Sequence, residues 1–225
     1  MIVPESDDTS TLPSVIYEQL QAAILNGVYK PGQVLRQEDV AAFLGVSRSP
    51  LREALSRLEA DGFVTSRPYR GYAVVNLEPA QIKEVFDLRS LLESELARRA
   101  IKKRTEADIS KVYRVVHQLS TPPDVANLTS LATWHRLHTS FHQALFEPSA
   151  CPHHLNAWRH SNNLIELFTR TESRLTGNVR KPQEEHIQLA QAFALGDEET
   201  FVALTRRHSD HTRQRLLRQL SGPTP

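Results

Sequence analysis

A change of hydrophobic period near residue 78 constrains the fold of this chain more than any other feature. Residues 63–75 alternate β-branched and aromatic side chains with polar ones, which is typical of a β-hairpin. Beyond residue 77, apolar side chains recur at helical spacing almost to the end. Because 225 residues are enough for two domains, we expect a domain boundary at this point.

Turn and capping residues divide the first part into elements. A helix is predicted from Ser14 to the stop signal at Gly27, and residues 29–35 are expected to form a turn. A short helix ending at Gly45 and a second one starting at Ser47 form a helix-turn-helix pattern. The following hairpin is expected to turn at residues 68–71.

The predicted fold class is mainly α, with a winged helix-turn-helix followed by an all-helical bundle. Residues 77–103 predict either two helices or one bent helix at the start of this bundle. The predicted parts are a flexible tail at 1–13, the winged domain with its small β-hairpin at 14–77, a linker at 78–82, and an effector-binding and dimerisation bundle at 83–220.

Composition excludes several classes of protein. The sequence has no apolar run long enough to span a membrane and no apolar segment typical of a secretion signal near its start. Cys151 is the only cysteine, so no disulfide can form within the chain. These features predict a cytoplasmic protein that does not associate with membranes.

The start of the second helix in the helix-turn-helix pattern carries side chains suited to DNA. Arg48 and Arg52 lie opposite the apolar stripe, where a recognition helix faces base edges. The guanidinium fork can pair bidentately with guanine, whereas hydroxyls such as those of Ser47 and Ser49 suit phosphate oxygens. Arg67, Tyr69 and Arg70 lie at the hairpin tip, where a wing contacts DNA.

The alternative is that these arginines only keep a surface helix soluble. The chain has a net charge of +1, and residues 14–77 contain seven Lys and Arg against six Asp and Glu. Net charge therefore does not indicate a nucleic-acid partner, and the case for DNA depends on where the arginines lie.

The sequence of residues 45–64, GVSRSPLREALSRLEADGFV, closely resembles the N-terminal domain of the GntR family of bacterial regulators. The resemblance implies that Arg48 and Arg52 read the operator and that Ser47 and Ser49 bind phosphates. It also implies that Arg70 and Gly71 form the wing tip. Where some members carry an arginine on the preceding helix, this chain has Glu38, with Arg36 nearby as a DNA contact.

Histidines gather in the helical part of the chain. His135, His138 and His142 share one helix face, while His186 and His208 lie on two later helices. Imidazole is the commonest metal ligand at neutral pH, and several converging imidazoles could bind zinc or nickel. The alternative for each single histidine is an ordinary surface or hydrogen-bonded side chain.

Residues 83–220 resemble FCD, the helical ligand-binding domain of the FadR-type branch of the same family. Three pieces carry the resemblance, DLRSLLESELARRAI, HTSFHQALF and EEHIQLAQAFALGD, with a later histidine in RRHSDH. The metal ligands it implies are His142, His186 and His208, with His138 where other members have aspartate. Imidazole at that position favours zinc or nickel, or marks a site that has lost its metal.

Arg89 is the predicted effector-binding residue. Inside a bundle its guanidinium could clamp the carboxylate of a small organic acid, the usual effector class by resemblance. The alternative is a pair with Glu93, one helical turn later, on a solvent-exposed face.

These observations predict a DNA-binding transcription regulator that is not an enzyme, with repression the favoured mode. The expected partners are double-stranded DNA with a palindromic operator, a small organic acid, and a second copy of the chain in a homodimer. The expected cofactor is a divalent ion, with zinc preferred over nickel. The alternatives are a metal-dependent hydrolase, for which no catalytic motif is present, and a bundle with a purely structural metal.

Overall fold

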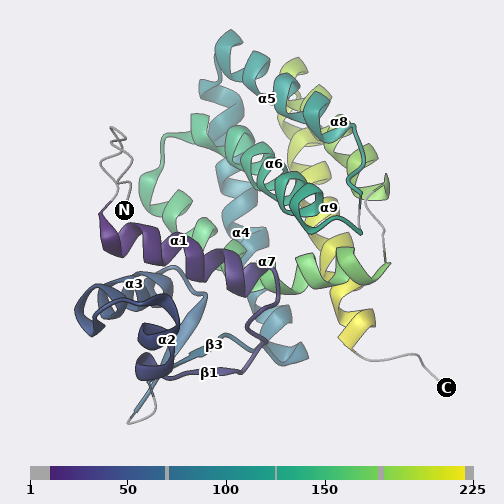
Figure 1. The fold of residues 1–225 in the computed structure, drawn as a ribbon. Helices are drawn as coiled ribbons and strands as arrows, with labels where there is room; N and C mark the ends of the chain where they lie inside the picture. The colour runs from purple at the N-terminus through teal and green to yellow at the C-terminus, as the bar shows by residue number, and fades with distance from the viewer. Residues whose placement is uncertain (1–10, 69–70, 125, 177–179, 221–225) are drawn as a thin grey trace, which may run out of the picture. The chain divides into compact units, whose positions relative to one another are not determined.

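The computed structural model describes residues 11–68, 71–124, 126–176 and 180–220 (Figure 1). The chain forms two compact units that divide between Asn76 and Leu77, and each is described by itself. None of the helices in these residues is both long enough and apolar enough to cross a membrane.

The first unit combines three helices with a small sheet. Helix α1 begins two residues earlier than predicted, because Pro13 is compatible with a first helical turn. The proposed tail at 1–13 is therefore too long at its C-terminal end, and residues 1–10 lie outside the described residues. The elements are α1 (Leu12–Leu25), β1 (Val34–Leu35), α2 (Gln37–Leu44), α3 (Arg48–Ala60), β2 (Val64–Arg67) and β3 (Gly71–Val74).

The sheet contains one more strand than the hairpin that the sequence predicts. Strands β2 and β3 pair antiparallel, with Arg67 opposite Gly71, and β1 pairs with the other edge of β3. Prediction of residues 29–35 as a turn was wrong for Val34 and Leu35. Two residues are too short to show an alternating pattern, so the sequence could not reveal β1.

One apolar core holds this unit together. Helix α1 contributes side chains at helical spacing and packs against α3. The α3 stripe is fully buried, which leaves the opposite face of that helix to solvent. The buried side chains are Ile16, Leu20 and Ile24 of α1 and Leu51, Ala54, Leu55 and Leu58 of α3.

Gly71 allows a close approach between β3 and the end of β1. Its φ is +82°, and a Cβ there would lie 2.9 Å from the Leu35 carbonyl oxygen. We expect Gly71→Ala to lower the free energy of unfolding by about 2–3 kcal/mol, because backbone strain and the contact add. Gly45, with φ +65° and nothing within 4 Å, provides the control, and Gly45→Ala should cost about 1 kcal/mol. Urea denaturation of the full chain measures both, and equal losses would contradict the steric argument.

The second unit is helical throughout its described residues. Helix α4 is a single helix of 25 residues, and it packs against both α7 and α9 (Figure 1). The helices are α4 (Pro79–Lys103), α5 (Glu106–Leu119), α6 (Leu128–Phe146), the 3-10 turn η1 (Glu147–Ser149), α7 (Pro152–Thr176), α8 (Arg180–Leu195) and α9 (Glu198–Leu220). The predicted fold class, mainly α with a small N-terminal sheet, is confirmed.

The predicted linker at 78–82 is wrong for residues 79–82, which form the first turn of α4. Pro79 suits the start of a helix, where its missing N–H costs no hydrogen bond. Glu78 and Gln81 form a reciprocal capping box, in which the Glu78 backbone N–H donates to Gln81 Oε1 at 3.0 Å.

Aromatic side chains form the centre of the helical core. Phe141 and Phe146 of α6 pack with Trp158 of α7, and Phe193 of α8 packs edge-on to Phe201 of α9. All five are nearly inaccessible to solvent. These contacts join α6 to α7 and α8 to α9 within one core, which holds the helices that carry the histidines.

Candidate functional site

The start of α3 presents the predicted DNA-reading side chains to solvent. Ser47 is the N-cap residue, and its side chain makes no cap hydrogen bond. Arg48, Ser49 and Arg52 follow on the exposed face, opposite the buried leucines. The local geometry therefore exposes the hydroxyls and guanidinium groups to a partner outside the unit.

Arg48 pairs with Glu38 of the preceding helix. Its Nη2 donates to Glu38 Oε1 at 2.8 Å, and both side chains are more than two thirds exposed. An exposed pair of this kind contributes little stability. It does hold the long Arg48 side chain near one orientation in the unbound protein.

The other predicted DNA contacts surround this surface. Arg36 is the exposed N-cap residue of α2, and Arg67 ends β2 with an exposed side chain. Gly71 begins β3 on the far side of the hairpin turn. Tyr69 and Arg70, predicted at the wing tip, lie outside the described residues.

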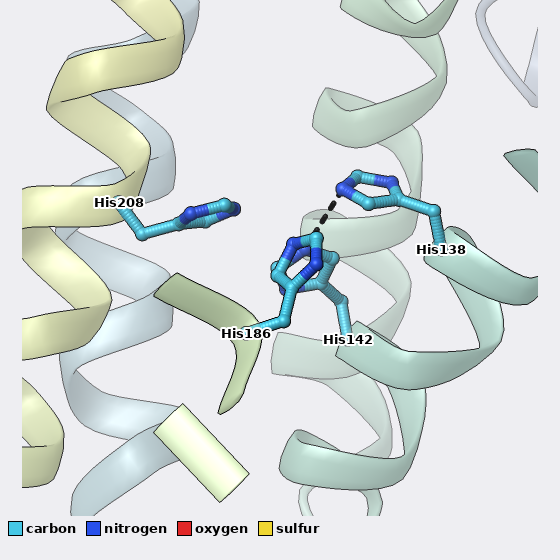
Figure 2. Close-up of side chains that lie close together, drawn as sticks. All are labelled: His138, His142, His186 and His208. Atoms are coloured by element: carbon cyan, nitrogen blue, oxygen red, sulfur yellow. Dashed lines mark hydrogen bonds between the residues drawn. The ribbon is translucent and has the colours of Figure 1, made fainter. Parts of the chain in front are cut away.

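Four histidines from three helices point toward one centre (Figure 2). His138 and His142 extend from α6, His186 from α8 and His208 from α9. Their ligand nitrogens all lie within 4.8 Å of one another, and the Nε2 atoms of His138 and His142 are 3.3 Å apart. His138 is half-buried and the other three are buried.

Burial keeps most of this cluster uncharged. Desolvation, followed by the charges of neighbouring groups, lowers the pKa of His138, His142 and His186 well below its usual value. Neutral imidazole is the form that binds a metal, so these side chains are ready to act as ligands at neutral pH.

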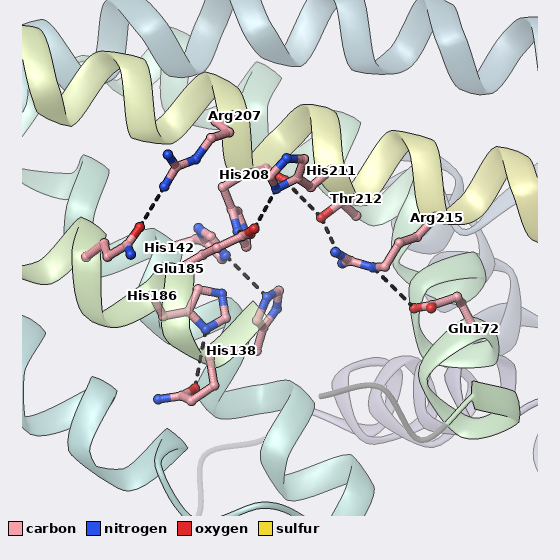
Figure 3. Close-up of polar contacts among 12 residues, drawn as sticks. His138, His142, Glu172, Glu185, His186, Arg207, His208, His211, Thr212 and Arg215 are labelled. Atoms are coloured by element: carbon pink, nitrogen blue, oxygen red, sulfur yellow. Dashed lines mark hydrogen bonds and ion pairs between the residues drawn. The ribbon is translucent and has the colours of Figure 1, made fainter. Parts of the chain in front are cut away.

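Glu185 orients His208, a contact that the sequence analysis did not predict. The His208 Nδ1 atom lies 2.7 Å from Glu185 Oε2, and His211 Nδ1 lies 2.5 Å from Oε1 (Figure 3). Burial would raise the pKa of Glu185, but the hydrogen bonds with His208 and His211 outweigh it and lower this pKa to about 2. The carboxylate therefore accepts from Nδ1 and leaves His208 Nε2 for the cluster.

The cluster fits a divalent ion in chemistry and spacing. His186 Nε2 is buried, and within the described residues it has no hydrogen-bond partner. Zn–N bonds of about 2.0–2.1 Å in a tetrahedron separate the nitrogens by about 3.3 Å. The His138–His142 separation already matches this value, and the others need only side-chain adjustment.

Arg89 forms the pair with Glu93 that the sequence offered as the alternative, but the pair is buried and not solvent-exposed as expected. Its Nε and Nη2 donate to Glu93 Oε1 at 3.0 and 2.7 Å, and Trp158 Nε1 donates to the same oxygen at 3.1 Å. The pair is buried because α4 packs against α7, which carries Trp158. The charge of Arg89 still reaches the cluster, because it contributes to the low pKa of His142.

Comparison with known proteins identifies both units. Residues 12–74 match the bacterial regulatory proteins of the gntR family, and residues 84–211 match the FCD domain. The chain belongs to the GntR family. An HTH-type transcriptional regulator of Bacillus subtilis, YdhC, is 31% identical over 75% of this chain and 81% of its own length. The Escherichia coli transcriptional repressor RspR is 27% identical over 94% and 87% of the two chains.

Solved structures agree with this fold. The structure of E. coli McbR/YncC superimposes with a TM-score of 0.78 at 20% identity, covering 94% of this chain and 100% of that one. The family matches and the named relatives are transcription regulators and not enzymes, which confirms the prediction that this chain is a regulator and not an enzyme. The GntR match implies DNA binding by the first unit, and the FCD match suggests effector binding by the second.

Proposed function

We infer that this GntR-family regulator is a homodimeric repressor of the FadR-type branch, whose operator affinity responds to a small organic acid bound in the bundle. The observation that carries the inference is the histidine cluster of the second unit, in a chain whose helix-turn-helix exposes arginines. A site enclosed by α6, α8 and α9 couples to DNA if the acid favours one arrangement of the two winged units.

The proposal assigns operator reading to the exposed face of α3. Arg48 and Arg52 pair with guanine edges, and Ser47 and Ser49 bind phosphates together with the helix N-terminus. The surrounding contacts with the DNA backbone are assigned to Arg36, Arg67, Tyr69, Arg70 and Gly71. Two copies of the chain then read a near-palindrome with half-sites about 34–36 Å apart.

Substitution of Arg48 tests this assignment. We expect Arg48→Ala to weaken binding to each half-site about tenfold to a hundredfold, because a bidentate arginine–guanine contact is worth about 1–3 kcal/mol. Fluorescence anisotropy with a labelled operator at physiological salt measures the change. Arg114→Ala removes an exposed arginine from α5 of the other unit and should leave affinity unchanged. Equal effects of the two substitutions would reject a recognition role for Arg48.

The proposal assigns a divalent ion to His138, His142, His186 and His208, with zinc preferred and nickel the second choice. The nitrogen-only ligand set, the neutral imidazoles and the orienting Glu185 support it. When bound, such an ion acts as a Lewis acid that attracts carboxylate oxygens. Four imidazoles complete a tetrahedron, so an acid requires an expanded coordination shell.

Arg89 completes the proposed effector site from α4. Its guanidinium is held in place by Glu93, and its charge contributes to the low pKa of His142. We assign it electrostatic attraction of the acid toward the cluster. The alternative of a purely structural ion predicts that acids leave operator affinity unchanged at every concentration.

A further inference from the structure

Arg215 differs from Arg89 and Arg170, two other arginines with buried side chains in the bundle. Arg89 and Arg170 each donate two hydrogen bonds to a single carboxylate, with distances of 3.0 and 2.7 Å to Glu93 and of 2.9 and 2.6 Å to Glu166. Arg215 has a side chain that is only 14% exposed, yet among the described residues its Nε has no hydrogen-bond partner.

The nearest carboxylate does not satisfy this guanidinium. Glu172 Oε2 lies 3.8 Å from Arg215 Nε, which is beyond hydrogen-bonding distance. Burial lowers the pKa of Arg215, as expected for a cation that has lost water without a close counter-ion. A buried donor left without an acceptor requires an explanation, and a ligand that brings the acceptor provides one.

The Arg215 side chain extends toward the histidine cluster (Figure 3). It follows His208 by seven residues, and therefore lies on the same face of α9. Its Nη2 donates to Thr212 Oγ1 at 3.0 Å, which shows that the side chain leans back along α9 toward His208. Its charge contributes, after burial and the charge of His208, to the low pKa of His186.

The cluster and Arg215 offer two separate places for negative charge. A divalent ion held by the four imidazoles would receive no negative charge from its ligands. The Glu185 carboxylate beside His208 offsets part of that charge, and Glu172 compensates Arg215 only loosely. One carboxylate can therefore meet the ion, whereas the unpartnered Nε of Arg215 requires a second acceptor.

We propose that Arg215 binds one carboxylate of a short-chain dicarboxylate whose other carboxylate meets the histidine cluster. The unpartnered Nε donates to this carboxylate, and the second N–H of Nη2, which already donates once to Thr212, completes the forked geometry that arginine forms with carboxylates. The effector is therefore a dicarboxylate rather than a monocarboxylate. This inference rests on the proposed function, because it names the class of acid that the regulator detects.

Matched pairs of acids test the inference on the zinc-loaded full-length protein. The probes are malonate, succinate and glutarate, each compared by isothermal titration calorimetry with its half-amide, which keeps the shape and removes one charge. We expect at least one dicarboxylate to bind about tenfold more tightly than its half-amide, because a hydrogen bond to a charged group supplies that difference.

Substitution of Arg215 locates the second carboxylate. Arg215→Met should abolish the preference while zinc content, measured by metal analysis, stays unchanged. Arg170→Met is the control, because it removes an equally buried arginine whose fork is already occupied, and the preference should persist. Equal binding of each dicarboxylate and its half-amide to the native protein would overturn the inference. A preference that survives Arg215→Met would overturn it too.

A second variant does not depend on removing the arginine. Glu172→Gln eliminates the competing carboxylate beside Arg215, so the preference for the dicarboxylate should increase while half-amide binding stays the same. An unchanged preference in this variant would contradict the inference even if Arg215→Met failed to fold.

If monocarboxylates bind and release the operator without any dicarboxylate preference, the proposed function stands and only this inference fails. If no acid of either class binds, both fail.

Discussion

Zinc should raise the melting temperature of the chelator-treated protein by about 8–16 °C when its free concentration is near 1,000 times Kd. Linkage at that concentration contributes about 4 kcal/mol. Each kcal/mol moves the melting temperature of a domain of this size by about 2–4 °C. Zinc concentrations of this size relative to Kd can be reached because the four imidazoles are gathered and burial keeps His138, His142 and His186 neutral, so little reorganisation weakens binding. Differential scanning fluorimetry in a zinc buffer measures it.

Two histidine substitutions separate binding at the cluster from binding elsewhere. His142→Ala removes one buried ligand and should eliminate the shift, whereas His117→Ala removes an exposed histidine of α5 and should preserve it. A chelator should reverse the shift in the native protein. A shift of the same size in His142→Ala, or no shift in the native protein, would contradict a metal site at these residues.

Acidification should destabilise the metal-free protein steeply below about pH 6.5. Burial, followed by the charge of Arg170, lowers the pKa of His135 to about 3, and burial also lowers the pKa of His142 and His186 well below 6.5. Between those values and 6.5 the unfolded chain binds protons that the folded protein does not. Stability is therefore fully present above pH 6.5 and is lost as pH falls.

The expected change in the free energy of unfolding with pH is large enough to measure. Each buried neutral histidine costs up to about 1.4 kcal/mol per pH unit, so His135, His138, His142 and His186 together cost up to about 5.5 kcal/mol per unit. Urea denaturation in chelator at pH 7.0, 6.0 and 5.5 measures it. His135→Phe should flatten the curve by about a quarter, because this side chain is buried and its Nε2 has no partner among the described residues. A flat pH profile for the native protein would contradict burial of neutral imidazoles.

Local sequence patterns were sufficient for the recognition helix. The stripe of Leu51, Leu55 and Leu58 placed Arg48 and Arg52 on the exposed side, where the structure has them. The i, i+4 spacing of His138 and His142 likewise placed both rings on one face of α6. These features depend on positions within one helix, which periodicity predicts well.

Contacts between elements could not be predicted from the sequence. Strand β1 forms only because β3 offers a free edge. Glu185 reaches His208 and His211 because α8 packs against α9, and the Arg89–Glu93 pair is buried because α7 covers α4. Arg215 gave no signal in the sequence, since its unsatisfied Nε appears only once its neighbours are in place.

The central claim is that an acid bound in the bundle sets the affinity of this regulator for DNA. Operator selection tests this claim most directly. The zinc-loaded protein would select sites from random duplexes, and anisotropy at physiological salt would compare the best site with a scrambled one. We expect a near-palindrome that binds about 1,000-fold more tightly than the scrambled duplex. A short dicarboxylate should shift that affinity without affecting the scrambled duplex. Equal affinity for the two duplexes, or a selected site that ignores every acid, would contradict the account.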